Sequence, residues 1–216
     1  MRLVLPRLYV ILDSALLTIP VQECAQELAD AGVRLLQYRS KTAPARELLL
    51  SSRSLSSQLI PRGISFFVND RPDVAVLAGA AGVHVGQDDL EVEQARVLMG
   101  TEKWVGVSTH NIDQFRAAAA TSADYIAVGP VFATSSKANP DPVIGTEFIQ
   151  RVRDLTDKPI VAIGGITLEN AASVVLAGAD CVAVISDILR SPDRGARAKQ
   201  YLETLGATKH TATARE

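Results

Sequence analysis

The stretch from 64 to 89, ISFFVNDRPDVAVLAGAAGVHVGQDD, decides the expected fold of this chain. Two short apolar runs, at 64–68 and 82–85, flank a helix-like segment that opens at Arg71–Pro72 and closes at a glycine. Proline is favoured in the first turn of a helix, and glycine directly after its end. The stretch therefore predicts a strand, a helix and a second strand, which is the repeating unit of a parallel sheet.

The same unit recurs along the whole chain. The predicted strands span 8–12, 34–39, 64–68, 82–85, 104–108, 124–129, 159–164 and 181–186. Segments between them, such as 21–32 and 45–60, carry apolar residues at three- and four-residue steps, which is typical of helices. Most of the runs are apolar throughout, as in strands covered on both faces. We predict a single-domain (β/α)8 TIM barrel over 1–205 and a disordered tail over 206–216, with an open doubly wound sheet as the alternative.

Composition narrows the possible partners. The 216 residues are 47% hydrophobic and carry a net charge of -2, so no basic patch for nucleic acid or membrane is expected. Cys24 and Cys181 lie far apart, without a Cys/His cluster, which favours a reducing, cytoplasmic location. Pro6 and Asp13 interrupt the apolar start of the chain, which argues against a signal peptide, and no apolar run is long enough for a bilayer. The oligomeric state is not indicated.

In a TIM barrel the active site lies at the carboxyl ends of the strands. The second strand ends in QYRSK, where Gln37, Arg39 and Lys41 alternate. Period two places them on one side if the strand continues that far. An amide and two cations at this end of the barrel, its mouth, could bind a phosphate group together. A solvated charged turn is the alternative.

Carboxylates follow the third and fourth strands. Asn69 and Asp70 suit either a ligand site or an Asx turn with a helix cap. Asp88 with Glu91 fits a capping box, which leaves Asp89 without a local role. Because neighbouring strands lie about 4.8 Å apart, Asp70 and Asp89 could converge, and two such carboxylates need a proton or a cation between them. Mg²⁺ that also binds a diphosphate would account for both.

The fifth strand ends in GVSTHN, where Ser108 is a candidate phosphate donor. His110 is a possible acid–base residue, although a lone loop histidine is more often structural. His84 lies within a strand, where packing or hydrogen bonding is the simpler interpretation.

The later loops suggest a second phosphate site. The long connection 130–145 carries Thr134, Ser136 and Lys137 and is either a substrate cover or a plain surface loop. Glycines at 164–165 and the Ile185–Ser186 pair follow the seventh and eighth strands, where this barrel often binds phosphate. The chain offers no Ser–His–Asp set, catalytic cysteine or zinc motif, so its chemistry should depend on a good leaving group.

Several motifs resemble thiamine-phosphate synthase over residues 8 to 190, in the order of that family. They are LYVILD, LQYRSK, FFVNDRPDVAVLAGAAGVHVGQDDL, GVSTH, DYIAVGPVFATSSK, PIVAIGGI and AVIS. The resemblance implies a Mg²⁺-dependent transferase. Such an enzyme joins 4-amino-2-methyl-5-(diphosphooxymethyl)pyrimidine to a 4-methyl-5-(2-phosphoethyl)thiazole, in its plain or 2-carboxy form. The products are thiamine phosphate and diphosphate.

The resemblance also implies roles for individual residues. The pyrimidine diphosphate contacts would be Gln37, Arg39, Lys41, Asn69, Ser108 and Lys137. Catalysis would involve Arg39, Lys41, Ser108 and Lys137. The Mg²⁺ ligands would be Asp70 and Asp89. The thiazole phosphate contacts would be Thr134, Ser136, Gly165, Ile185 and Ser186.

Two positions depart from the family pattern. Ser40 stands where glutamate is usual, which leaves the orientation of Lys41 open, and Ser136 replaces a threonine but keeps the hydroxyl. The alternatives are a thiazole tautomerase of the same barrel family and a non-catalytic phosphate-binding barrel. The tautomerase has no need for the diphosphate and metal set, and ligand binding without product would favour the phosphate-binding barrel.

Overall fold

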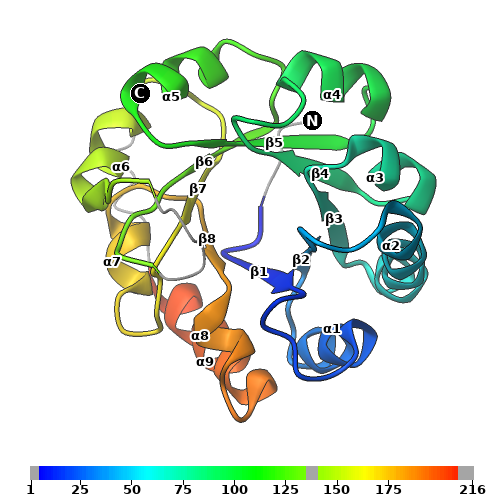
Figure 1. Cartoon of the computed structure of the whole chain (residues 1–216). Coiled ribbons are helices and arrows are strands. Elements are labelled where there is room, and N and C mark those ends of the chain that lie inside the picture. Colours follow the sequence, from blue (N-terminus) through cyan, green and yellow to red (C-terminus); the bar gives the residue numbers. More distant parts are fainter. Residues whose placement is uncertain (1–4, 135–140, 209–216) are drawn as a thin grey trace.

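The computed structural model describes residues 5–134 and 141–208. Within them, eight parallel strands close into a barrel in sequence order, β1 to β8, as Figure 1 shows. The strands are β1 Leu8–Asp13, β2 Leu35–Arg39, β3 Ser65–Asn69, β4 Gly82–Val85, β5 Trp104–Thr109, β6 Tyr125–Val128, β7 Ile160–Ile163 and β8 Cys181–Val184. Every predicted strand is present, and no strand end differs from its predicted position by more than two residues. The barrel is confirmed, and β1 pairs with β8, which excludes the open sheet.

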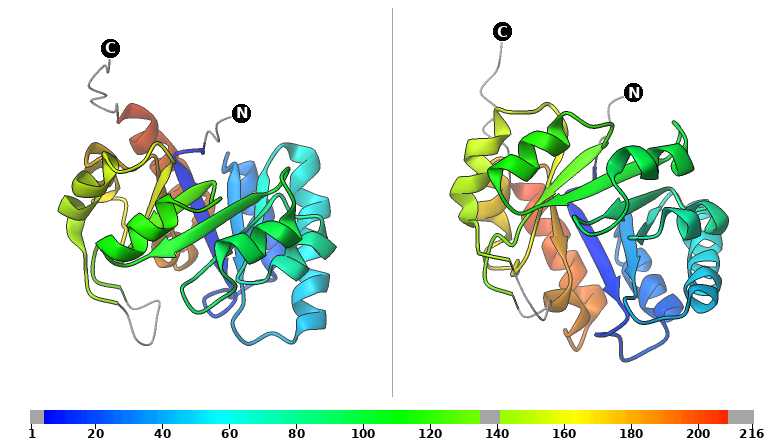
Figure 2. Two further views of the ribbon diagram at one scale, coloured as in Figure 1. Left: turned by 90° about the horizontal axis from the view of Figure 1, so that it is seen from above. Right: turned by 45° about the horizontal axis from the view of Figure 1, so that its top comes forward.

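Helices surround the barrel, as both views in Figure 2 show. They are α1 Val21–Asp30, α2 Ala45–Leu59, the 3-10 turn η1 Ile60–Arg62, α3 Pro72–Ala78, α4 Val92–Met99, α5 Ile112–Ala119, α6 Gly145–Arg153, α7 Ala171–Leu176, α8 Ser186–Leu189 and α9 Arg194–Ala207. Pro72 opens α3 and Gly79 ends it in the left-handed region, as the sequence predicts. Gly206 and Ala207 of the predicted tail instead form the end of α9, and residues 209–216 lie outside the described residues. In the described part of the chain, no helix has both the length and the apolar character that a membrane span requires.

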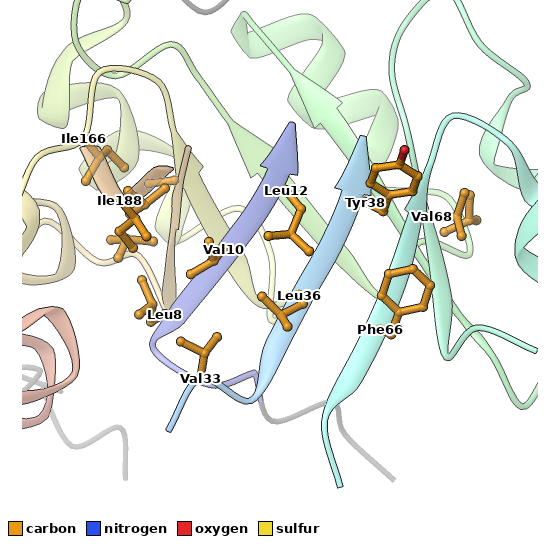
Figure 3. Packing of buried hydrophobic residues seen from close by; sticks show 14 of the residues in the cluster. Leu8, Val10, Leu12, Val33, Leu36, Tyr38, Phe66, Val68, Ile166 and Ile188 are labelled. Atoms are coloured by element: carbon orange, nitrogen blue, oxygen red, sulfur yellow. The ribbon is translucent and has the colours of Figure 1, made fainter. Parts of the chain in front are cut away.

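The larger core lies between the strands and the helices. Alternate strand residues such as Val10, Leu36 and Phe66 point outward into it, as Figure 3 shows. Helices α1 and α2 contribute Leu28 and Leu55 from their apolar faces, and both side chains are fully buried. Every second strand residue thus points outward, and these side chains pack in one layer against the apolar faces of the helices, which repeat about every 3.6 residues.

A second, smaller core fills the barrel itself. Its aromatic centre consists of Tyr9, Phe67 and Tyr125, whose rings meet edge to face at centroid distances of 5.9 to 6.3 Å. Room for Tyr125 comes from Gly106 on the neighbouring strand, because a Cβ there would lie 2.0 Å from the Cζ atom of Tyr125. The ring is therefore held against bare backbone, which fixes the position of its hydroxyl group.

Replacing Gly106 by alanine is expected to destabilise the barrel. The added methyl group collides with a ring that is fully buried, so the cost should reach at least the about 1–3 kcal/mol typical of overpacking. Urea denaturation measures the change in the free energy of unfolding. Gly206→Ala in α9 is the matched control, because its Cβ meets open space and alanine favours helix. A loss below about 0.5 kcal/mol for Gly106→Ala would contradict this packing.

Candidate active site

The second strand carries its polar residues toward the barrel interior. Gln37 lies deep inside, 1% exposed, and donates from Nε2 to the hydroxyl oxygen of Tyr9 at 2.6 Å. Arg39 ends the strand on the same side, and Lys41 follows two residues beyond it. The alternation predicted for Gln37 and Arg39 is therefore present.

Arg39 is held by a carboxylate on the neighbouring strand. Its guanidinium donates to Oδ2 of Asp13, which stands directly opposite in the β1–β2 register. The other carboxylate oxygen of Asp13 accepts from the backbone N–H of Ala15 at 3.0 Å. The Asp13 side chain is only 5% exposed, so the pair is partly removed from water. This orients a cation at the mouth of the barrel.

Asp70 and Asp89 meet across β3 and β4. Burial raises the pKa of Asp89, and a hydrogen bond with the Asp70 carboxyl group raises it further. The Oδ2 atom of Asp89 accepts from the backbone N–H of Gly86 at 2.8 Å, which holds the carboxylate in place. A carboxyl group whose pKa is raised by a neighbouring carboxylate marks a natural position for a cation.

Asp70 reaches this position through an unusual backbone conformation. Its φ angle is 63°, in the left-handed region where aspartate is tolerated better than most residues. The backbone N–H of Asp70 donates to the carbonyl oxygen of His84 at 2.7 Å, which extends the β3–β4 pairing by one residue. The chain can then turn toward α3. Strained backbone of this kind is common at functional sites.

Lys41 owes its orientation to Asp70. Its ammonium group forms an ion pair with Oδ2 of Asp70, so a third-strand carboxylate holds it. Ser40, in the place of the usual glutamate, instead accepts from the hydroxyl group of Ser14 at 2.9 Å. The substitution at 40 therefore leaves the cation at the mouth.

The donor set at this mouth fits Mg²⁺. Two carboxylates converge, and the described residues contain no group of three or more His, Cys, Asp or Glu side chains that could hold a metal alone. Mg²⁺ commonly takes one or two carboxylates and completes its shell with water and substrate phosphate oxygens. Asp70 and Asp89 match that pattern, while Zn²⁺ would call for a fuller set of nitrogen or sulfur ligands.

The predicted capping role of Asp88 is wrong. Helix α4 starts at Val92, so its N-cap is Glu91, and the capping box joins Glu91 to Gln94. The Oε1 atom of Gln94 accepts from the backbone N–H of Glu91 at 3.2 Å. Asp88 is exposed three residues before the cap. Likewise Arg71, rather than Asn69 or Asp70, is the N-cap of α3, without a side-chain capping bond.

Ser108 lies on the inner face of β5, held from two directions. The Nε2 atom of Gln87 donates to its backbone carbonyl oxygen at 2.7 Å. Its hydroxyl oxygen lies 2.8 Å from Nε2 of His84. His110, by contrast, contacts the carbonyl oxygen of Gly129 through Nδ1 at 2.6 Å. Its Nε2 atom lies 3.6 Å from Oδ2 of Asp141, so the ring is held between backbone and a carboxylate.

The other side of the mouth is built from the loops after β6, β7 and β8. Backbone N–H groups of Val131 and Phe132 donate to the carbonyl oxygens of Ile163 and Gly164 at 2.9 and 3.0 Å. A Cβ at Gly165, whose φ is 62°, would lie 2.3 Å from the carbonyl oxygen of Ala133. The glycine pair is therefore required where these two loops cross, besides any contact with a ligand.

The short helix α8 begins at Ser186, with Ile185 as its N-cap. A cavity of about 580 Å³ opens beside Ser186 and is also lined by Thr167 and Arg190. A short helix after the eighth strand is the usual phosphate-binding end of this barrel. Thr134 lies partly buried at the edge of the described region, and Ser136 and Lys137 lie outside the described residues.

Comparisons with known proteins identify the family of this chain. The family described as thiamine monophosphate synthase matches residues 8–188. This chain belongs to that family.

Individual relatives are similar over nearly their full length. Over 208 residues the chain is 50% identical to the thiamine-phosphate synthase of Koribacter versatilis, which covers 93% of this chain and 96% of the relative. It is 45% identical to the thiamine-phosphate synthase of Myxococcus xanthus, with 88% of each chain covered. Among solved structures, the thiamine phosphate pyrophosphorylase from Pyrococcus furiosus superposes with a TM-score of 0.85 at 31% identity, covering 94% of this chain and 96% of that one. The chain is accordingly an enzyme, a transferase of thiamine biosynthesis.

The sequence did not indicate four residues that lie at the candidate active site. Asp13, Tyr9 and Tyr125 lie on the inner faces of strands, and Gln87 lies between two motif residues. Period-two reading of the strands would have found the three inner-face positions. Their hydrogen-bond and ion-pair partners could not be predicted from the alternation, because each partner lies on another strand.

Proposed function

We propose that this chain is a thiamine-phosphate synthase. It joins a hydroxymethylpyrimidine diphosphate to a thiazole phosphate and releases diphosphate. Beyond the family match, one observation carries the proposal: Asp70 and Asp89 converge beside the ammonium group of Lys41, which follows two residues after the Arg39–Asp13 ion pair. A tautomerase that binds only the thiazole phosphate needs no such set.

The diphosphate end would be held by charge. Asp70 and Asp89 would bind Mg²⁺, which would neutralise charge on the departing diphosphate. Arg39 ends the neighbouring strand β2 and Lys41 follows it, and Asp13 and Asp70 orient their cationic groups. Lys137 is assigned to the same group from the resemblance alone.

The two organic partners would occupy opposite sides of the mouth. Gln37, Asn69 and Ser108, on the inner faces of β2, β3 and β5, would contact the pyrimidine diphosphate. The thiazole phosphate contacts would be Thr134, Ser136, Gly165, Ile185 and Ser186. The members of this group that the structure describes lie after β6, β7 and β8, at the usual phosphate end of the barrel, which supports the assignment.

The proposed reaction needs no protein nucleophile. The pyrimidine ring can release electron density to its exocyclic methylene, so the carbon–oxygen bond to diphosphate can break first. The thiazole nitrogen already carries a free lone pair and attacks the resulting cation. The protein would hold both partners in line and stabilise charge on the leaving group. The cations and carboxylates described at the mouth fit this division of work.

The remaining proposals concern the setting of the enzyme. The catalytic domain would span residues 1–205, with small-molecule partners and a cytoplasmic location. Burial raises the pKa of Cys24 to about 11 and that of Cys181 still further, so both thiols would stay protonated in a reducing compartment.

The decisive assay combines the protein with both substrates and Mg²⁺. We expect diphosphate and thiamine phosphate in equal amounts, loss of both with a chelator, and recovery when Mg²⁺ is added back. The readouts are phosphate release after pyrophosphatase treatment and chromatographic detection of thiamine phosphate. Conversion of the thiazole phosphate alone, without diphosphate release, would indicate a tautomerase instead. Substrate binding without any product would indicate a phosphate-binding barrel.

A further inference from the structure

Five polar side chains form a continuous hydrogen-bonded row inside the barrel. They come from five different strands and are Gln37, Tyr9, Tyr125, His84 and Ser108. Along the row, the contacts are Gln37 Nε2 to Tyr9 Oη at 2.6 Å, Tyr9 Oη to Tyr125 Oη at 3.4 Å, Tyr125 Oη to His84 Nδ1 at 2.9 Å and His84 Nε2 to Ser108 Oγ at 2.8 Å. The row joins two residues that the proposed function assigns to the same substrate, Gln37 and Ser108.

The middle of the row is sealed from water. Tyr125 is fully buried and Tyr9 is 1% exposed. Burial raises the pKa of both hydroxyl groups, so each keeps its hydrogen. Each buried hydroxyl hydrogen therefore needs an acceptor within the row.

The number of available hydrogens fixes which group donates and which accepts at each hydrogen bond of the row. The Nε2 atom of Gln37 can only donate, so Tyr9 accepts from it and is free to donate to Tyr125. Tyr125 then donates to Nδ1 of His84. In the opposite arrangement Tyr125 would donate to Tyr9, and the hydrogen of Tyr9 would have no acceptor among these groups.

The direction ends at the mouth. With Nδ1 of His84 accepting, the ring in its neutral form carries its hydrogen on Nε2 and donates it to Ser108 Oγ. Ser108 then uses one lone pair for the imidazole, and its own hydrogen points to another acceptor. A serine held in this way acts as a fixed donor.

We propose that His84 is a positioning residue, held by Tyr125 and Tyr9 as the Nε2–H tautomer, which makes Ser108 a donor to the pyrimidine substrate. The acceptor would be a phosphate oxygen or a ring nitrogen. The identity of this ligand rests on the proposed function. The tautomer and the direction of the row do not, since they follow from the protein alone.

The first experiment observes the tautomer directly. Long-range proton–nitrogen NMR of histidine-labelled protein without substrate shows which ring nitrogen carries hydrogen, and the His84 signals are assigned by their loss in His84→Gln. We expect hydrogen on Nε2 and a bare Nδ1. Hydrogen on Nδ1, or on both nitrogens at neutral pH, would overturn the proposal. This result does not depend on whether the chain makes thiamine phosphate.

The second experiment tests whether the row acts through Ser108. Tyr125→Phe removes a single hydroxyl group and should lower kcat about tenfold, the effect of one lost hydrogen bond. Ser108→Ala should cost on the order of 10²-fold, as for other lost transition-state donors. In the Ser108→Ala background, Tyr125→Phe should cost nothing further, because the residue it positions is gone.

Tyr38→Phe is the matched control. Tyr38 lies on the outer face of β2, 5% exposed, within the layer between strands and helices. Its loss of a hydroxyl group should leave kcat unchanged. A further tenfold loss from Tyr125→Phe in the Ser108→Ala background would show independent effects and overturn the positioning role, even in an enzyme that makes thiamine phosphate.

Discussion

Replacing Asp89 by asparagine is expected to lower kcat on the order of 10²–10³-fold while leaving the metal-free protein at least as stable as before. Activity falls because one of two carboxylates at the proposed Mg²⁺ position is lost. Stability is kept because burial and Asp70 raise the pKa of Asp89 in the folded protein. The folded state therefore opposes the charge on Asp89, and asparagine removes that charge.

The pH dependence of the free energy of unfolding also reports the raised pKa of Asp89. A carboxyl group whose pKa is raised on folding costs stability as the pH rises from the unfolded pKa of about 3.9 through the folded pKa, after which the cost is constant. Chemical denaturation of the metal-free protein should show this loss for the parent chain and not for Asp89→Asn. Mg²⁺ should raise the Tm of the parent chain and leave that of Asp89→Asn unchanged.

Asp88→Asn provides the control for this experiment. The two aspartates are adjacent, but Asp88 is exposed and is neither the cap of α4 nor part of the described mouth. We expect its activity and its Mg²⁺ response to stay within twofold of the parent chain, a range that corresponds to about 0.4 kcal/mol. Equal losses from Asp88→Asn and Asp89→Asn would refute the assignment of Asp89 as the metal ligand.

Replacing Arg39 by methionine is expected to destabilise the protein by about 3–5 kcal/mol and to remove activity. The stability loss arises because Asp13, whose side chain is 5% exposed, keeps a buried charge without its partner. The activity loss arises because the variant lacks a cationic group that would bind the diphosphate. Urea denaturation and the two-substrate assay measure the two effects separately.

A second variant separates these effects. Adding Asp13→Leu to Arg39→Met removes the buried charge as well, so stability should return while activity stays lost. Arg62→Met is the control, since Arg62 pairs with an exposed Asp30 and should cost no more than about 1 kcal/mol. If the double variant were as unstable as Arg39→Met, the buried Asp13 charge would not be the cause.

Local patterns made much of the barrel predictable. The eight apolar runs, the glycine that ends α3 at Gly79 and the proline that opens it at Pro72 each depend on a few neighbouring residues. The candidate residues at the strand ends were predictable for the same reason, since a parallel barrel places every carboxyl end at one mouth. The capping role of Asp88 failed because it depended on where α4 begins, and helix ends are the least local part of the pattern.

The strand and helix order, the family motifs and the kinds of chemistry available can be read from the amino-acid sequence, because short-range periodicity and residue type are local properties of the chain. Which side chains meet depends on the packing of the whole barrel. Asp13 contacts Arg39, Lys41 contacts Asp70, and the row from Gln37 to Ser108 crosses five strands. These contacts depend on strand register and barrel closure, which arise only when residues far apart in the chain pack together.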